Sequence, residues 1–254
     1  MRSRIESGSS QQWVACLIIG ILCLFSSVSA FSPPTLGIGA LVFPIRGKTI
    51  TGLSEDITGY NKAAVIQEAS DFFVDAFWTK KVGGGAKKLT NSQRRSLEQS
   101  QYAEFNKRYG GSRSRSAEML VARKNDEVLA CAGVEVETIP SDSLRGPVLA
   151  RAPLMSNLAV SRRCRRRGLA EEMVLAVEKF VKDEWEFDEC YLYVEERNIA
   201  AVKLYQKLGY KKLWRDNNAK TLMPTESGQL VTANTVIVCM KKQLNSNFFS
   251  RFFQ

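Results

Sequence analysis

Apolar residues are spaced along this chain in two ways, one typical of helices and one typical of strands. Recurrence every three or four residues predicts helices over four stretches, 64–78, 91–109, 169–181 and 199–208. Short alternating or clustered apolar runs predict strands over 48–53, 118–123, 127–138, 153–160, 189–195 and 231–240. The order is one strand, two helices, three strands, a helix, a strand, a helix and one or two final strands. No repeat is visible, so a single α/β (α+β) domain is expected.

The stretch at 158–170, LAVSRRCRRRGLA, joins a predicted strand to the third predicted helix. A helix that begins near Gly168 leaves its first backbone N–H groups without helical partners and points its positive dipole end at the preceding loop. Such an end binds phosphate, and a glycine lets the backbone approach a bulky anion closely. The same arginines are also consistent with a solvated charge run or a nucleic-acid-binding patch.

Composition narrows the possible chemistry. The net charge of +10 suggests an acidic ligand or partner, although part of the excess lies in the N-terminal region. The chain has no histidine, which excludes His-based triads and His metal sites. Proton transfer must therefore use Glu, Asp, Tyr, Lys, Cys, water or backbone groups. Beyond residue 30, four cysteines are scattered without a CxxC pair, so neither a disulfide framework nor a metal site is predicted.

The N-terminal region has the features of a targeting segment. Residues 1–30 combine a basic start, an apolar run of about a dozen residues and a small-residue exit, as in a secretory signal peptide. Residues 31–47 contain no acidic residue. The junction at 29–33, Ser-Ala-Phe-Ser-Pro, resembles the two-part plastid presequences of algae with complex plastids. This resemblance implies delivery to the plastid stroma. The alternative is a secreted protein, or one attached to a membrane by an uncleaved N-terminus.

Two segments of the chain resemble the GNAT superfamily of N-acetyltransferases. Residues 165–170, Arg-Arg-Arg-Gly-Leu-Ala, fit its cofactor motif, which is Gln or Arg, two residues, Gly, one residue, then Gly or Ala. Residues 198–210 fit its Asn-x-x-Ala-x-x-Leu-Tyr-x-x-x-Gly-aromatic segment. The resemblance covers about residues 48–242, leaving 243–254 as a C-terminal tail. It implies a mixed, mostly antiparallel sheet of six to seven strands with about four helices, and acetyl-CoA as co-substrate.

The resemblance also implies roles for individual residues. Backbone groups of Leu158, Ala159 and Val160 would bind pantetheine where two neighbouring strands splay apart, and an N–H there would stabilise the oxyanion. Asn198 would hold the pantetheine arm, and Tyr205 would donate a proton to the sulfur. Tyr205 is also consistent with a core aromatic residue on a helix face. The residues implied to hold the pyrophosphate are Arg165, Arg166, Arg167, Gly168, Leu169 and Ala170.

The general base is where the sequence departs from the family pattern. Relatives often carry a glutamate at one of two positions, which here are occupied by Leu154 and Tyr193. Glu195 lies two residues beyond Tyr193 and therefore on the same strand face, which makes it the candidate base. The alternatives are that Glu195 is a solvated charge at a strand end, that water relays the proton, or that bulk solvent accepts it.

The function implied is direct acetyl transfer from acetyl-CoA to an amine in a ternary complex. The acceptor is a protein lysine, a protein N-terminus or a small amine. Two alternatives remain, a GNAT-fold protein that binds acetyl-CoA without catalysis and a basic nucleic-acid-binding module. We expect no nucleic-acid partner, no metal, and membrane contact only through an uncleaved N-terminal segment.

The cofactor-turn hypothesis predicts different effects for two neighbouring substitutions. Gly168→Asp places a side chain and a negative charge in the turn, so acetyl-CoA binding measured by calorimetry should be abolished. Arg162→Ala lies outside the motif and should barely alter that affinity. Equal losses from both would mean that the stretch acts through bulk charge.

Overall fold

The computed structural model describes residues 42–45, 48–52, 62–78, 90–110, 116–124, 127–141, 148–224 and 230–244. The predicted signal peptide, most of the segment predicted over 31–47, and the predicted tail beyond residue 244 lie outside these ranges, and those predictions stay untested. Across the described ranges, no helix has the length and apolar character needed to cross a membrane.

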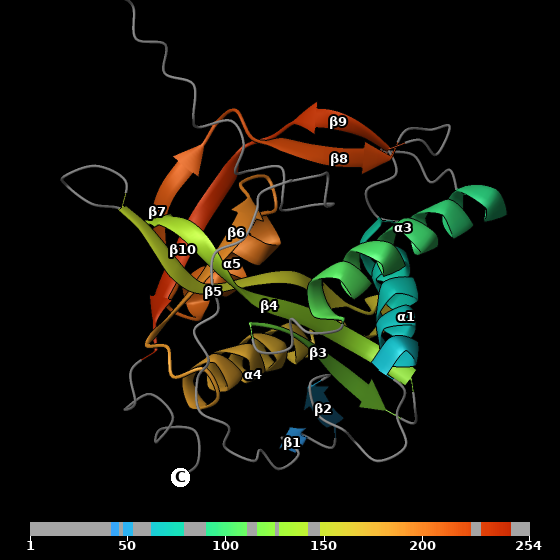
Figure 1. The fold of residues 1–254 in the computed structure, drawn as a ribbon, viewed down its shortest axis with the longest axis horizontal. Coiled ribbons are helices and arrows are strands. Elements are labelled where there is room, and N and C mark those ends of the chain that lie inside the picture. The colour runs from blue at the N-terminus through green and yellow to red at the C-terminus, as the bar shows by residue number, and fades with distance from the viewer. Residues whose placement is uncertain are drawn as a thin grey trace, which may run out of the picture.

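An eight-stranded mixed sheet forms the centre of the domain (Figure 1). Every neighbouring pair of strands is antiparallel except β5 and β6, which are parallel. A separate antiparallel hairpin consists of β8 (Lys220–Pro224) and β9 (Leu230–Asn234). In spatial order the sheet strands are β1 (Val42–Ile45), β2 (Lys48–Gly52), β3 (Ala117–Lys124), β4 (Glu127–Ser141), β5 (Val148–Val160), β6 (Glu189–Glu195), β10 (Ile237–Gln243) and β7 (Lys211–Asp216).

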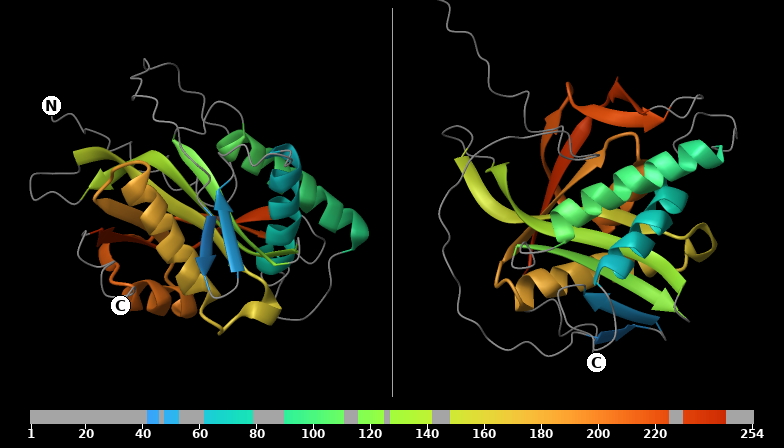
Figure 2. Two further views of the ribbon diagram at one scale, coloured as in Figure 1. Left: turned by 90° about the horizontal axis from the view of Figure 1, so that it is seen from below. Right: turned by 45° about the vertical axis from the view of Figure 1, so that its right-hand side comes forward.

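Helices cover both faces of the sheet (Figure 2). On one face, α1 (Lys62–Phe73), its π-helical continuation Val74–Trp78, and α3 (Asn91–Tyr109) pack on alternate residues of β3 such as Met119. On the other face, α4 (Leu169–Asp183) and α5 (Ile199–Lys207) pack on the intervening residues such as Leu120. The period-two alternation of a strand therefore divides the apolar residues between two cores.

The structure confirms the predicted fold class and all four predicted helices. Thr90 caps α3, its hydroxyl accepting from the Gln93 N–H at 3.3 Å while the Gln93 side chain accepts from the Thr90 N–H at 2.7 Å. The prediction of one strand over 231–240 was wrong, because β9 and β10 are separate and pair with different partners. Strands β1, β7 and β8 were missed. The sequence of β7, KKLWRD, is mostly charged because β7 is an edge strand.

One ion pair is buried between α4 and the sheet. Lys242 Nζ on β10 lies 2.5 Å from Glu178 Oε2 on α4, and the two side chains are 8% and 1% exposed. Burial raises the pKa of the Glu178 carboxyl, and the positive charge of Lys242 opposes that rise. The lysine therefore compensates a carboxylate that would otherwise be buried with its charge unbalanced.

Removal of that lysine should destabilise the fold strongly. Lys242→Met leaves Glu178 buried without its cation and should lower the free energy of unfolding by about 3–5 kcal/mol in urea titrations. The double variant Lys242→Met/Glu178→Leu should recover most of the loss. As a matched control, Lys182→Met removes the more exposed pair with Asp188 and should cost about 1 kcal/mol or less. Equal losses from the two single variants would contradict this account.

Candidate active site

Strands β5 and β6 pair only briefly, and the site lies where they separate. Their parallel register consists of Leu154 with Tyr191 and Met155 with Leu192. Immediately afterwards, β5 shifts register against β4, and Asn157 takes a φ of 54°, which is uncommon for a non-glycine residue. Beyond this bulge, β5 continues to pair with β4 but no longer with β6. The edge of β5 over 157–160 therefore faces an open wedge, as predicted for residues 158–160.

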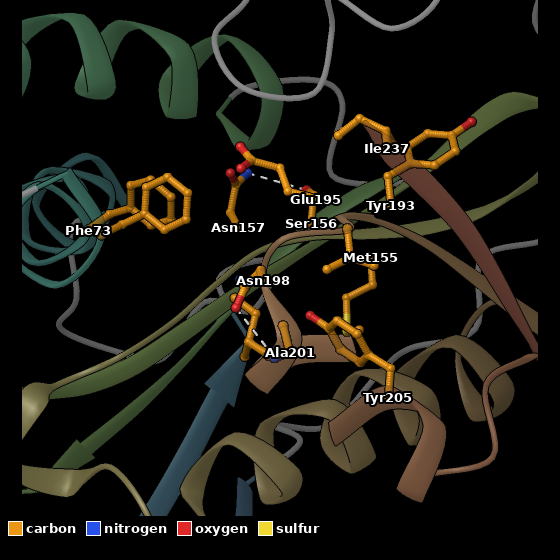
Figure 3. A pocket seen from close by; sticks show the side chains of 13 residues that line it. Phe73, Met155, Ser156, Asn157, Tyr193, Glu195, Asn198, Ala201, Tyr205 and Ile237 are labelled. Atoms are coloured by element: carbon orange, nitrogen blue, oxygen red, sulfur yellow. Dashed lines mark hydrogen bonds between the residues drawn. The ribbon is translucent and has the colours of Figure 1, made fainter. Parts of the chain in front are cut away.

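A pocket of about 170 Å³ occupies this wedge (Figure 3). One wall is formed by α1 and its π-helical end, another by the bulge of β5, and the remainder by β6, α5 and the start of β10. Four residues assigned from the sequence, Leu158, Glu195, Asn198 and Tyr205, line this pocket. The lining residues are Phe73, Phe77, Met155, Ser156, Asn157, Leu158, Tyr193, Val194, Glu195, Asn198, Ala201, Tyr205 and Ile237.

A polar network, not foreseen from the sequence, holds the bulge. Arg108 on α3 donates from Nη2 to Ser156 Oγ at 2.9 Å and from Nε to Glu135 Oε2 at 3.2 Å. Asn157 Nδ2 donates to the Tyr109 hydroxyl at 2.9 Å. Ser156 and Asn157 are thus fixed from α3, and both line the pocket.

Gly133 of β4 allows Tyr109 to approach this network. A Cβ at position 133 would collide with the Tyr109 hydroxyl. A glycine inside an apolar strand often marks such a close approach, so Gly133 is the one sequence signal that points to the network.

The predicted cofactor turn has the geometry of an anion-binding helix start. Gly168 is the N-cap of α4, with a φ of 85° and no side-chain cap, and Arg166 has a φ of 61°. The first helical bond runs from the Glu172 N–H to the Gly168 carbonyl at 3.0 Å. The three N–H groups that precede it, at 169–171, therefore have no acceptor within the helix and are available to an anion.

The arginines around this turn do not form one charged patch. Arg163 pairs with Glu127 at the surface, whereas the side chains of Arg166 and Arg167 are exposed. Arg165 points inward instead and donates to two backbone carbonyls. Burial lowers the pKa of its guanidinium, and the neighbouring Arg162 adds to that effect. The turn therefore presents backbone N–H groups and two exposed arginines, while Arg165 is committed to the interior.

Tyr205 and Asn198 come to the pocket from α5. Tyr205 is only 7% exposed and packs edge-on against Tyr210, with ring centroids 5.8 Å apart. Burial raises the pKa of its hydroxyl, and Cys190 adds to the rise, so the phenol stays protonated at neutral pH. Tyr205 is thus both a core aromatic and a wall of the pocket. Asn198 caps α5 by accepting from the Ala201 N–H at 3.4 Å, which leaves its amide NH₂ group as a potential donor (Figure 3).

Glu195 lies in the pocket wall and is not the solvated strand-end charge considered from the sequence. Its side chain is 11% exposed. One carboxylate oxygen accepts from Arg197 Nε at 2.7 Å and the other from Thr221 Oγ1 at 3.0 Å. These two bonds hold both carboxylate oxygens of Glu195 in place at the pocket.

The two positions where relatives carry glutamate contribute no carboxylate here. Leu154 is buried in the sheet, and Tyr193 packs against Trp214 with ring centroids 5.3 Å apart. Burial raises the pKa of the Tyr193 hydroxyl, so it is neutral at physiological pH. Within the described ranges, no group of three or more His, Cys, Asp or Glu residues is gathered as a metal site would require.

The arrangement suits an extended ligand with an anionic part. The open edge of β5 offers backbone groups to a linear amide-containing arm, and the start of α4 offers N–H groups to phosphate. A neutral phenol and a carboxylate lie on the walls between α5 and β6. These are the groups needed to donate one proton and accept another during acyl transfer.

Comparison with known proteins agrees with this geometry. Residues 86–210 match the model of the acetyltransferase (GNAT) family. An N-alpha-acetyltransferase of Saccharolobus solfataricus is 36% identical over 67 residues, 26% of this chain and 40% of that protein. One from Sulfurisphaera tokodaii is 30% identical over 97 residues, 38% of this chain and 58% of that protein. The chain therefore matches less than two thirds of the length of either relative.

Solved structures with similar folds include an N-acetyltransferase from Staphylococcus aureus. It is 12% identical, with a TM-score of 0.48, and the alignment covers 78% of this chain and 97% of that chain.

Proposed function

We propose that this chain, whose residues 86–210 carry a domain of the acetyltransferase (GNAT) family, transfers the acetyl group of acetyl-CoA to an α-amine at the N-terminus of a protein or peptide. The observation that carries the proposal is the open wedge between β5 and β6, which is lined by Leu158, Glu195, Asn198 and Tyr205. The names of the two relatives support the α-amine as acceptor.

The residues of the cofactor turn and of the pocket have separate roles in the proposed reaction. Backbone N–H groups at 169–171 hold the pyrophosphate, with Arg166 and Arg167 adding positive charge. The exposed edge of β5 at 158–160 holds the pantetheine arm, and an N–H there stabilises the oxyanion. The acceptor amine would lie beside Glu195, and the thioester sulfur would lie beside Tyr205.

Two residues, Glu195 and Tyr205, carry out the proton transfers of the proposed reaction. An ammonium acceptor must lose one proton before it attacks, and Glu195, directly or through a water, takes that proton or passes it to solvent. Attack forms the C–N bond and a tetrahedral oxyanion. Collapse of this intermediate breaks the C–S bond, and Tyr205 donates its proton to the departing sulfur. The attacking nitrogen gives its second proton to solvent as the amide forms, and solvent reprotonates Tyr205.

A peptide panel tests the proposal. The purified full chain should bind acetyl-CoA in calorimetry, and it should release CoA when given peptides with free N-termini. N-terminally blocked peptides that contain lysine serve as the matched comparison, and mass spectrometry locates the acetyl group. Acetylation confined to lysine or to small amines would contradict the α-amine assignment. Binding without turnover on any acceptor would favour the non-catalytic alternative, and absence of acetyl-CoA binding would reject the proposal.

Replacement of Tyr205 tests its role as the acid. Tyr205→Phe removes only the hydroxyl, so kcat should fall about 10²-fold or more, the usual size of a general-acid contribution, while acetyl-CoA affinity changes by about twofold or less. Tyr102→Phe on α3 alters a residue outside the pocket and should leave kcat unchanged. An unchanged kcat in Tyr205→Phe would show that the thiolate leaves without this proton.

A further inference from the structure

We propose that Arg165 is a positioning residue that links the cofactor turn to the Phe73–Phe77 wall of the pocket, so that binding of CoA orders that wall. The inference rests on the proposed function, because it assumes that the turn at 165–170 binds the CoA pyrophosphate.

The guanidinium of Arg165 joins three segments. Its backbone begins the turn that precedes α4. Its Nε donates to the Val160 carbonyl at the end of β5 at 3.1 Å. Its Nη2 donates to the Ala76 carbonyl at 2.8 Å, across 89 positions of sequence. One side chain thus connects the cofactor turn, the strand that borders the wedge and the π-helical segment.

Ala76 precedes Phe77, so a charged hydrogen-bond donor that holds the Ala76 carbonyl also affects the position of the Phe73–Phe77 wall. Ala76 is 6% exposed and belongs to the π-helical segment Val74–Trp78. The Arg165 guanidinium gives the Ala76 carbonyl a charge-assisted hydrogen bond. The next residue, Phe77, stacks on Phe73 with ring centroids 4.8 Å apart, and both rings line the pocket. A shift of the Ala76 carbonyl therefore moves the wall.

An anion bound at the cofactor turn also affects the charge and the order of Arg165. In the free protein the Arg165 charge is partly desolvated and lies in the field of Arg162. A pyrophosphate at the start of α4 compensates both effects and fixes the backbone of the turn, where Arg166 and Gly168 have positive φ values. A more rigid Arg165 holds Ala76 more firmly. By thermodynamic linkage, order in the wall then favours CoA, and CoA favours order in the wall.

Replacement of Arg165 by glutamine separates the two roles of this position, which are to form the cofactor turn and to bond to the Ala76 carbonyl. The family motif accepts Gln or Arg here, so Arg165→Gln keeps a residue compatible with the turn. The shorter Gln side chain cannot reach both the Val160 and Ala76 carbonyls. Arg163→Gln is the matched control, because Arg163 precedes the turn by two residues and pairs with the exposed Glu127.

Hydrogen exchange of the full chain with and without CoA, read by mass spectrometry, tests the link. In the natural protein, CoA should slow exchange both in peptides spanning 158–173 and in peptides spanning 70–78. In Arg165→Gln, protection should persist at 158–173 and be lost at 70–78, with CoA affinity within about twofold of the natural value. For the best acceptor peptide of the panel, KM should rise about fivefold or more. Arg163→Gln should behave as the natural protein.

Three results would overturn the inference. The first is protection at 158–173 without any change at 70–78 in the natural protein, a result that needs no variant. The second is a loss of CoA affinity of about tenfold or more in Arg165→Gln, which would make Arg165 a direct phosphate ligand. The third is uncoupling in Arg163→Gln as well. Absence of protection in both segments of the natural protein would instead reject the proposed function, because the turn would not bind CoA.

Discussion

The short parallel pairing of β5 with β6 is the constraint on which the candidate site depends. Two residue pairs join these strands before the bulge at Ser156 and Asn157 turns β5 away. A longer pairing would satisfy the backbone of 157–160 within the sheet and leave no edge for a ligand. The bulge is held from outside the sheet, by Arg108 and Tyr109 on α3. The helix that covers one face of the sheet therefore also keeps the wedge open.

Because the chain has no histidine, its acid and base groups must be other side chains, whose protonation depends on their surroundings. Burial keeps Tyr205 protonated, which suits it to give a proton to a leaving thiolate. Arg197 and Thr221 hydrogen-bond to the two carboxylate oxygens of Glu195 and hold them in place. A phenol and a carboxyl group already differ in protonation state at neutral pH, and burial of Tyr205 raises the pKa of its hydroxyl further. Such a division between neighbouring groups is a common basis for acid and base roles.

The arginine-rich stretch illustrates how a charge cluster is divided in three dimensions. Arg163 forms a surface pair, Arg165 bonds to two partly buried backbone carbonyls, and Arg166 and Arg167 face solvent beside the start of α4. A nucleic-acid patch would present such residues together to a phosphate backbone. Here the inward arginine joins the turn to the π-helical segment through the Ala76 carbonyl.

Local patterns in the sequence determined the helices, the caps at Thr90 and Asn198, and the helix start at Gly168, because each depends on residues within one or two turns. The segment at 198–210 also pointed to Asn198 and Tyr205, and strand alternation pointed to Glu195; all three line the pocket. Only the tertiary structure decided the parts that depend on distant segments: Phe73 and Phe77 in the wall, Arg108 and Glu135 beneath the bulge, and Ala76 under Arg165. The edge strand β7 escaped prediction because an edge carries charge where a central strand is apolar. Contacts between residues dozens of positions apart leave no periodic signal, so packing alone determined that Arg165 turns inward while Arg166 and Arg167 face solvent.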